Sequence, residues 1–198
     1  MDSGLFSLIP LNSKSLCENL IADECVNINV VEPRKSKYGD FRFKVNNTPS
    51  ININRTNNCY KFLLIFLHEW AHYLVFKKYK SLTKPHGNEW KKEFISIINP
   101  FLDEKYFPKE ILSPLRNFML NPRATFSSDI KLMMALNFYD IKNNKKYIYE
   151  LNEGSQFIFN KKKYKLIRRR RKRFLCKCLS NSKMYLFSYF AIVDKNEI

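Results

Sequence analysis

Three residues within a five-residue stretch have the spacing of a metal site. His68, Glu69 and His72 form an H-E-x-x-H pattern. In an α-helix, residues i and i+4 lie on one face with Cβ atoms about 5–6 Å apart, so both imidazoles can reach one zinc ion. Glu69 directly follows the first histidine, where a carboxylate can accept a proton from an attacking water. The pattern predicts a zinc-dependent hydrolytic site.

A catalytic zinc ion needs a third protein ligand and an open coordination position. The downstream candidates are His86, Glu89 and Glu93. A site of the gluzincin kind would use one of the two glutamates. We favour His86, because the chain has three histidines and all of them lie between residues 68 and 86. The flanking proline and glycine can orient this imidazole where a loop meets a helix.

The same five residues also have an explanation that involves no metal site. An H-E-x-x-H match is short and can arise by chance in a buried helix. His68 and His72 would then be partly exposed helix residues, and Glu69 a surface acid. The helical context and the third histidine favour the metal site over this alternative.

Helices are expected on both sides of the third histidine. Asn57 or Asn58 can cap a long helix that runs to about Lys80. Asn88 can cap the next helix, which Pro100 ends. Trp70 and Trp90 are expected to pack at contacts between helices.

Outside these two helices, the period of the apolar residues changes along the chain. Alternation predicts strands over 41–45 and 50–54, joined by a turn at 46–49. Helical spacing predicts further helices over 12–26 and 128–139. Four prolines between residues 100 and 127 indicate short helical pieces and loops. From Tyr147 onward, short β-like runs alternate with turn signals.

The composition is that of a folded protein that seeks polyanions. The chain has 198 residues, 45% apolar and 27% charged, with a net charge of +17. Such a charge favours nucleic acid as the partner, with an anionic membrane surface second; for the basic run over 161–173, nucleic acid is favoured over passive solubility, with a membrane surface third. No apolar run approaches the roughly 20 residues of a membrane span, and no secretory signal is visible. Five cysteines, an odd and sparse set, indicate reduced thiols and a cytoplasmic location, with association with the nucleoid as an extension of it.

Residues 142–198 hold most of the excess charge, with 16 basic and 4 acidic residues. Within them, the 13 residues from 161 to 173 include ten basic residues. Tyr164 lies within this run, and Phe174 follows it directly. This density predicts a surface that tracks phosphates, with aromatic rings as stacking platforms. The proposed nucleic-acid-binding residues are Lys161, Lys162, Lys163, Lys165, Arg168, Arg169, Arg170, Arg171, Lys172 and Arg173.

The stretch HEWAHYLVFKKYKSLTKPHGNEWKKEFISI (68–97) closely resembles the SprT-like zinc metalloproteases, the group that includes Spartan. Their signature is H-E-x-x-H on a helix, a loop, and then H-G-x-x-[FW] opening the next helix. This chain matches it through the residues His68, Glu69, His72, His86, Gly87 and Trp90. The preceding YGDFRF…ININ (38–54) is similar to the strand pair that such domains place before the active-site helix, so the resemblance covers about residues 10–100.

The resemblance implies one zinc ion per chain held by His68, His72 and His86, with Glu69 as catalytic acid and base. It settles the third ligand as His86 over Glu89. It also implies the family's association with DNA, where members cleave proteins bound or crosslinked to it.

The chain departs from the family at its C-terminal end. Many SprT-like proteins end in a four-cysteine zinc ribbon, whereas this tail has only Cys176 and Cys178. Two thiols cannot complete a tetrahedral structural site. We therefore expect a metal-free relative of the ribbon, held together by aromatic residues, in which both cysteines fill the core.

We predict an α+β fold in two parts: a small zincin-like catalytic domain over 1–145, and a basic β-hairpin-rich subdomain over 146–198. The expected function is that of a monomeric, zinc-dependent endopeptidase acting on proteins bound or crosslinked to nucleic acid, with DNA favoured. The stretch between Phe41 and Asn54 is expected to supply an edge strand that pairs with an extended substrate. The alternative is a non-catalytic nucleic-acid-binding protein with a structural zinc site, against which the intact Glu69 argues.

Overall fold

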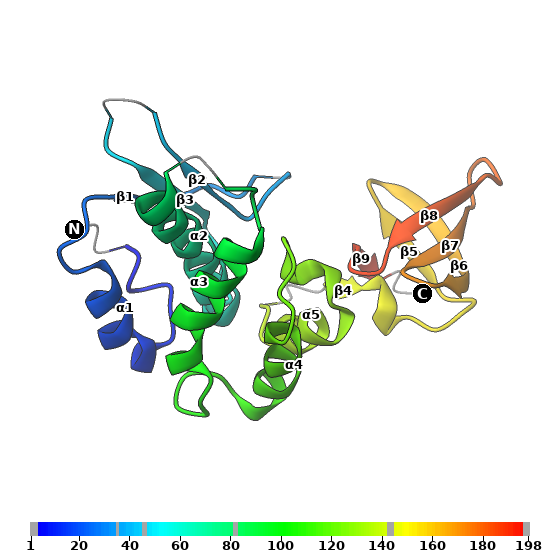
Figure 1. Cartoon of the computed structure of the whole chain (residues 1–198). Helices are drawn as coiled ribbons and strands as arrows, with labels where there is room; N and C mark the ends of the chain where they lie inside the picture. The colour runs from blue at the N-terminus through cyan, green and yellow to red at the C-terminus, as the bar shows by residue number, and fades with distance from the viewer. Residues whose placement is uncertain (1–3, 35, 45–46, 81–82, 142–144, 196–198) are drawn as a thin grey trace. The chain divides into compact units, whose positions relative to one another are not determined.

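The computed structural model divides into two compact units, Met1–Asp140 and Ile141–Ile198 (Figure 1). The first combines helices with a sheet, and the second is built around a sheet. The predicted division, after residue 145, lies five residues later than the observed one. The chain as a whole combines helices and two β-sheets, which confirms the α+β class. Among the described residues, no helix has both the length and the apolar character needed to cross a bilayer. The structure describes residues 4–34, 36–44, 47–80, 83–141 and 145–195.

The first unit has five α-helices and a three-stranded sheet among its described residues. Its helices are α1 (Lys14–Ile21), α2 (Cys59–Tyr79), α3 (Asn88–Ile98), α4 (Lys109–Met119) and α5 (Ile130–Asn137). Its strands are β1 (Asn27–Val31), β2 (Gly39–Arg42) and β3 (Ser50–Asn54). The sheet order is β1-β3-β2, with β1 parallel and β2 antiparallel to β3. Strand β2 is therefore an edge strand.

The predicted pair of strands is confirmed, and a third strand was missed. Phe41 lies opposite Ile51 in the antiparallel register. The first strand of the pair spans Gly39–Arg42, so the prediction over 41–45 was wrong at Phe43 and Lys44, while Val45 lies outside the described residues. Strand β1 falls at the end of the helix predicted over 12–26. That prediction was wrong beyond Ile21, because Asp23 has a left-handed φ of 60° that ends helical backbone.

Helix α2 is the central element of the first unit. It is buried along nearly its whole length, with Phe62, Leu67 and Trp70 fully shielded from solvent. The Asn58 side chain accepts a hydrogen bond from the Lys61 backbone N–H at 3.0 Å, as the capping prediction requires. The Asn58 amide also donates to the Leu136 carbonyl at 2.7 Å, which ties the start of α2 to α5. The helix that holds the H-E-x-x-H pattern is thus anchored at its first turn.

Two other helix predictions needed correction. Residues 100–127 do not consist only of short pieces, because α4 runs for 11 residues with Pro114 inside it. The buried face of this helix, which includes Ile111, Leu115 and Phe118, offsets the hydrogen bond that proline cannot donate. Helix α3 has Gly87 as its N-cap, and Asn88 is its first residue. Asp129 caps α5, accepting from the Leu132 N–H at 3.0 Å.

The second unit is a six-stranded sheet in which neighbouring strands are antiparallel, as its β-rich sequence predicted. The strand order is β4-β9-β5-β6-β7-β8. One face of this sheet is buried, and its core includes Phe157, Tyr164, Leu166, Phe174 and Phe187. The strands are β4 (Lys145–Tyr147), β5 (Gln156–Phe159), β6 (Lys162–Arg170), β7 (Arg173–Cys178), β8 (Met184–Ser188) and β9 (Ile192–Lys195).

Both cysteines of the tail lie in this core. Cys176 and Cys178 have no exposed surface, and they occupy the same side of β7 as Phe174. Within the described ranges, neither thiol belongs to a cluster able to hold a metal ion. The arrangement supports the core-filling interpretation.

Candidate metal centre

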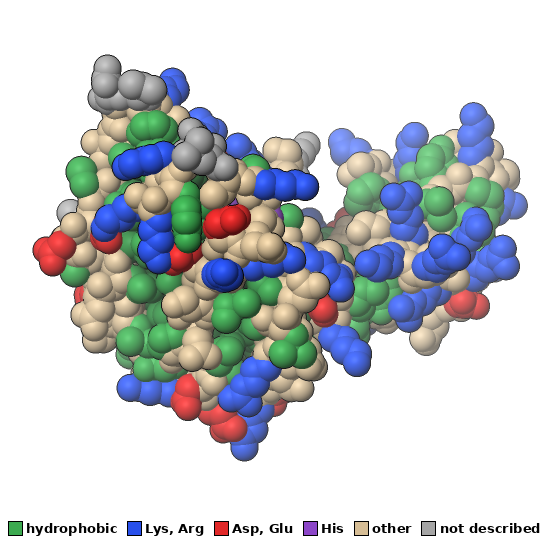
Figure 2. All heavy atoms as spheres, viewed as in Figure 1, with side chains coloured by type: hydrophobic (Ala, Val, Ile, Leu, Met, Phe, Trp, Pro, Cys, Tyr) green, Lys and Arg blue, Asp and Glu red, His purple; other side chains and the backbone are tan. Residues whose placement is uncertain are grey.

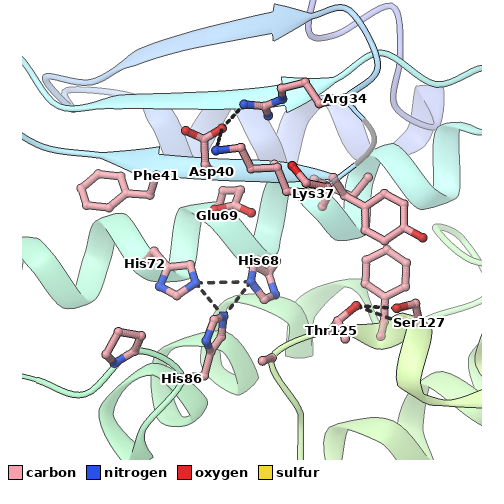
Figure 3. Close-up of a pocket in the computed structure, with 17 residues that line it drawn as sticks. Arg34, Lys37, Asp40, Phe41, His68, Glu69, His72, His86, Thr125 and Ser127 are labelled. Atoms are coloured by element: carbon pink, nitrogen blue, oxygen red, sulfur yellow. Dashed lines mark hydrogen bonds and ion pairs between the residues drawn. The ribbon is translucent and has the colours of Figure 1, made fainter.

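The three histidines converge from two elements. His68 and His72 lie one turn apart on α2, and His86 immediately precedes Gly87, the N-cap of α3. His86 has a left-handed φ of 57°, a conformation that costs a non-glycine residue about 1–2 kcal/mol. The Gly87 N–H donates to the Lys84 carbonyl at 2.9 Å and closes the turn that presents His86. This strained backbone conformation directs the His86 imidazole toward the other two (Figure 3).

The spacing of the imidazoles matches that of a shared metal ion. The Nε2 atoms of His68 and His72 are 3.3 Å apart, and that of His86 lies 3.1 Å from the first and 3.0 Å from the second. Tetrahedral coordination at 2.0–2.1 Å puts two ligand nitrogens about 3.3 Å apart. Within the described part of the chain, these three residues are the cluster able to hold a metal ion.

The protonation of the imidazoles also suits metal binding. Burial lowers the pKa of all three rings, and it is the main cause in each. The neighbouring imidazoles lower the pKa of His68 further, to well below its usual range, and His86 helps to lower that of His72 to about 4. At neutral pH the rings are uncharged, and a neutral ring nitrogen is the form that ligates metals.

Trp90 packs against all three imidazoles. Its ring centroid lies 4.7 Å from that of His68, 5.5 Å from that of His72 and 4.8 Å from that of His86. Trp90 is 1% exposed, and its indole N–H points to the His68 carbonyl at 3.4 Å. The packing role predicted for this residue is thus specific, since it fixes the side of the histidine cluster that faces α3.

The two glutamates that were weighed as third ligands lie elsewhere. Glu93 forms an ion pair with Lys78, with 2.6 Å between carboxylate oxygen and Nζ. Glu89 stands in the first turn of α3 and is not part of the histidine cluster. The geometry favours His86 as the third ligand.

Glu69 is a buried carboxylic acid beside the cluster. It is 6% exposed, and Figure 3 shows it between β2 and the imidazoles. Burial raises its pKa to about 8, and the negative charge of Asp40 acts in the same direction. A hydrogen bond from the Phe41 backbone N–H and the charges of Arg34 and Lys37 act in the opposite direction. Burial therefore brings the pKa of Glu69 closer to neutral pH, where a carboxyl group can both accept and donate a proton.

Strand β2 approaches Glu69 at a glycine. A Cβ atom built on Gly39 would lie 2.7 Å from Glu69 Cγ and 2.8 Å from its Oε1. No side chain fits there without moving the glutamate. Gly39 lets the edge strand lie directly against the carboxylate.

A network of ion pairs holds β2 next to this glycine. Asp40 forms ion pairs with Arg34 and Arg42, and a longer one with Lys37 at 3.4 Å. Partial burial alone would raise the pKa of Asp40, but the hydrogen bonds from the two arginines and the nearby positive charges outweigh it and lower the pKa. The Arg34 Nε also donates to Asn54 on β3 at 2.7 Å, so the network links adjacent strands.

The histidines and Glu69 line a cavity of about 810 Å³. Its lining comes from three places: residues 34 and 36–41, which lead into β2 and include part of it; the three histidines with Glu69 and their neighbours; and residues 124–127. Tyr38 and Phe126 stack with their ring centroids 5.5 Å apart and connect the first of these segments to the last. The cavity volume is large enough for several residues of an extended peptide.

The ten basic residues predicted to bind nucleic acid all lie in the second unit, but not on one surface. We call the side of the sheet opposite its buried core the outer face. The β6–β7 register places five of them there. Each alternates along its strand with core-facing residues or lies opposite an outward residue of the other strand: Lys163, Lys165, Arg168, Arg170 and Arg173. Arg169 lies opposite the buried Phe174, on the core side, with its guanidinium 4.8 Å above the Tyr189 ring.

The remaining basic residues of the run are at strand ends and turns. Lys162 lies opposite Phe159 and Lys161 precedes it in a turn, while Arg171 and Lys172 form the turn between β6 and β7. Lys177, which was not among the predicted residues, lies opposite Lys165 on the outer face. The alternation of Arg173, Leu175 and Lys177 with three buried residues of β7 was the signal that could have found it.

The chain was compared with protein-family models, curated proteins and solved structures, and none of them matches it.

Proposed function

We propose that this chain is a zinc-dependent endopeptidase. The observation that carries the proposal is the convergence of three neutral imidazoles with Nε2 atoms 3.0–3.3 Å apart, beside the buried Glu69, in one cavity. Three nitrogen ligands that leave one position open are typical of catalytic zinc, whereas structural sites use four protein ligands. The donor set of three imidazoles fits zinc, although other transition metals also accept it.

In this proposal, different residues of the chain bind the metal ion and transfer the protons during peptide hydrolysis. His68, His72 and His86 would hold the zinc ion, which when bound supplies a Lewis acid and lowers the pKa of water. Glu69 would take the proton from the attacking water and deliver it to the leaving amine nitrogen. The hydrogen bond from the Phe41 N–H and the contact with Gly39 keep its carboxylate in place for both transfers.

The edge strand supports a peptide as the substrate. Among the described residues, β2 has β3 as its only strand neighbour. Apart from the Phe41 N–H, which donates to Glu69, the backbone groups on its other side would be available to an extended chain. Residues 39–41 of this strand line the cavity together with Glu69. A peptide added to β2 would pass in front of the carboxylate and the three histidines.

The resemblance to SprT-like proteases supports a more specific proposal, that the substrates are proteins bound or crosslinked to nucleic acid. The positive charge of the second unit is consistent with it. In this proposal the zincin-like first unit cuts, and the second unit concentrates substrate by binding the nucleic acid. A cytoplasmic location and a monomeric state belong to the same proposal.

The test compares cleavage of a basic DNA-binding protein by the wild type and by Glu69→Gln, with and without DNA. Glu69→Gln should keep one zinc ion and the fold, while cleavage falls by roughly two or more orders of magnitude. Glu89→Gln is the matched control, because it makes the same chemical change outside the cavity. Equal cleavage by Glu69→Gln and the wild type would refute the mechanism.

The second candidate, a non-catalytic nucleic-acid-binding protein with structural zinc, predicts a different pattern. The wild type would then hold zinc and bind DNA without cleaving any protein. The buried Glu69 disfavours it, because burying a carboxyl group costs stability and brings a structural site no ligand.

A further inference from the structure

Four neighbouring strands of the second unit contain no acidic residue. Strands β5, β6, β7 and β8 have eight Lys and Arg residues between them and no Asp or Glu. Figure 2 shows basic side chains spread over the visible surface of this unit. Because the strands are adjacent in the sheet, the register decides how many of these charges share one face.

A β-bulge at Ile167 determines which arginines reach the outer face. Before it, Lys165 lies opposite Lys177; after it, Arg168 lies opposite Leu175, and Ile167 has no partner. With strict alternation, Ile167 and Arg169 would follow Lys165 on the outer face. The bulge instead places Arg168 and Arg170 there and turns Arg169 toward Tyr189.

The outer face therefore holds six exposed cations. They are Lys163, Lys165, Arg168, Arg170, Arg173 and Lys177. In the part of the chain that the structure describes, none of the six forms an ion pair. Their charges are available to a ligand.

Two of the contacts on this face are unfavourable in the absence of a ligand. Lys165 lies directly opposite Lys177, and Arg170 directly opposite Arg173. Like charges at opposite positions of neighbouring strands destabilise a sheet. A polyanion lying across β6 and β7 would relieve both repulsions at once.

The apolar residues of this face are aliphatic. Leu175 lies between Arg173 and Lys177, and on β8 Met184 and Leu186 are about half exposed. The rings expected to act as stacking platforms are not available, because Tyr164 and Phe174 are each 6% exposed and face the core. That expectation was wrong, since β alternation turns both rings to the side opposite the cations.

We propose that the outer face of β6 and β7 binds the sugar–phosphate backbone of nucleic acid through these six cations, without stacking on the bases. It deepens the nucleic-acid part of the proposed function and does not depend on the metal site. A face that contacts phosphates alone has no reason to prefer single strands. At equal numbers of contacts, duplex DNA releases more counterions than a single strand and is bound at least as tightly.

The experiment measures binding of fluorescent 20-mer DNA to the full chain carrying Glu69→Gln, across a salt series. The test variant changes Lys165, Arg170, Arg173 and Lys177 to Gln, removing both like-charged pairs. The magnitude of its log–log salt slope should fall by about 3–4, and its affinity at low salt by about a hundredfold or more. Duplex should bind at least as tightly as single-stranded DNA of the same length and show no sequence preference.

Two controls separate the outer face from charge in general. Changing Lys92, Lys105, Lys109 and Lys131 to Gln removes the same charge from exposed positions of the first unit, and should leave the slope nearly unchanged. The single variants Arg168→Gln and Arg169→Gln compare adjacent arginines on opposite faces. Arg168→Gln should lower the slope by about 1, and Arg169→Gln by much less.

The same salt series includes vesicles with anionic lipid as competitor. Displacement of DNA only at lipid concentrations far above those of DNA supports the proposal. Equal salt slopes for the test variant and its first-unit control would overturn it, as would much tighter binding of single strands. Because the protein carries Glu69→Gln throughout, a failure of proteolysis leaves these readouts intact.

Discussion

Gly39 and Glu69 are in contact to the point that a single methyl group would not fit between them: a Cβ on residue 39 would lie 2.7 Å from Glu69 Cγ. The contact joins the edge strand β2 to the acidic residue of the H-E-x-x-H pattern. The strand that would align a peptide and the carboxylate that would move its protons are therefore held in one fixed geometry.

We expect Gly39→Ala to displace the Glu69 carboxylate, because the extra methyl group must push it away. Proteolysis, measured as kcat/KM, should fall by about ten- to a hundredfold, the usual effect of a displacement near 1 Å. Metal analysis should still find one zinc ion per chain. In the Glu69→Gln background, the alanine should reduce kcat/KM little further, since both changes act through one group. Wild-type activity in Gly39→Ala would contradict the positioning role of this contact.

Removal of the third imidazole should strip the metal. His86→Ala is expected to weaken zinc affinity by more than the roughly 10–100-fold that follows loss of an outer-shell partner. Glu89→Ala, three residues further on, is the control and should keep full affinity, because its carboxylate is outside the histidine cluster. Competition with a fluorescent chelator measures both. Retention of zinc by His86→Ala would mean that the ligand set is wrong.

Chelation should destabilise the first unit. An ion that binds the native state at a hundred times its Kd adds about 2.7 kcal/mol to the free energy of unfolding. For a unit of this size, its removal should lower Tm by about 5–10 °C. Trp70 and Trp90, the chain's two tryptophans, both lie in this unit, so their fluorescence follows its melting. A Tm that is the same with and without chelator would argue against a resident metal.

The Asp40 network predicts acid sensitivity. The pKa of Asp40 is lowered in the folded state, so its ion pairs contribute stability that is present above the unfolded pKa of about 3.9 and is lost as pH falls through the folded value. At neutral pH, Asp40→Asn should cost about 1.5–3 kcal/mol of unfolding free energy, because two arginines lose a charged acceptor. Denaturant titrations at pH 7 and at pH 3 measure this difference. The variant should differ less from the wild type at pH 3; an equal difference at both pH values would contradict the assignment.

The sequence predicted most of the candidate metal centre because the signals for these residues are local. The i, i+4 spacing of His68 and His72 requires only a helix, and Asn58 marks where that helix starts. His86 could be chosen from the scarcity of histidine, but its left-handed φ could not be foreseen. The close approach of Gly39 to Glu69 was also out of reach, since it depends on how a strand packs against a helix 30 residues away.

Other features were missed because they depend on contacts that are distant in sequence. Strand β1 exists through its parallel pairing with β3, more than 20 residues later, and its own residues carry a weak pattern. Pro114 was interpreted as a break, whereas the buried face of α4 keeps the helix intact around it. On the second unit, composition revealed the positive charge, but only the register shows which cations share a face.

The bulge at Ile167 also affects which single-residue deletions strand β6 can accommodate. Loss of Ile167 alone would convert β6 into a regular strand and leave Arg168 and Arg170 on their present side, because the unpaired residue is the one removed. In sequences related to this one, a one-residue gap is therefore expected to be tolerated at this point of the strand. A second one-residue gap in β6 would have no unpaired residue left to absorb it and would turn charged residues of the strand toward the core, so it should be rare.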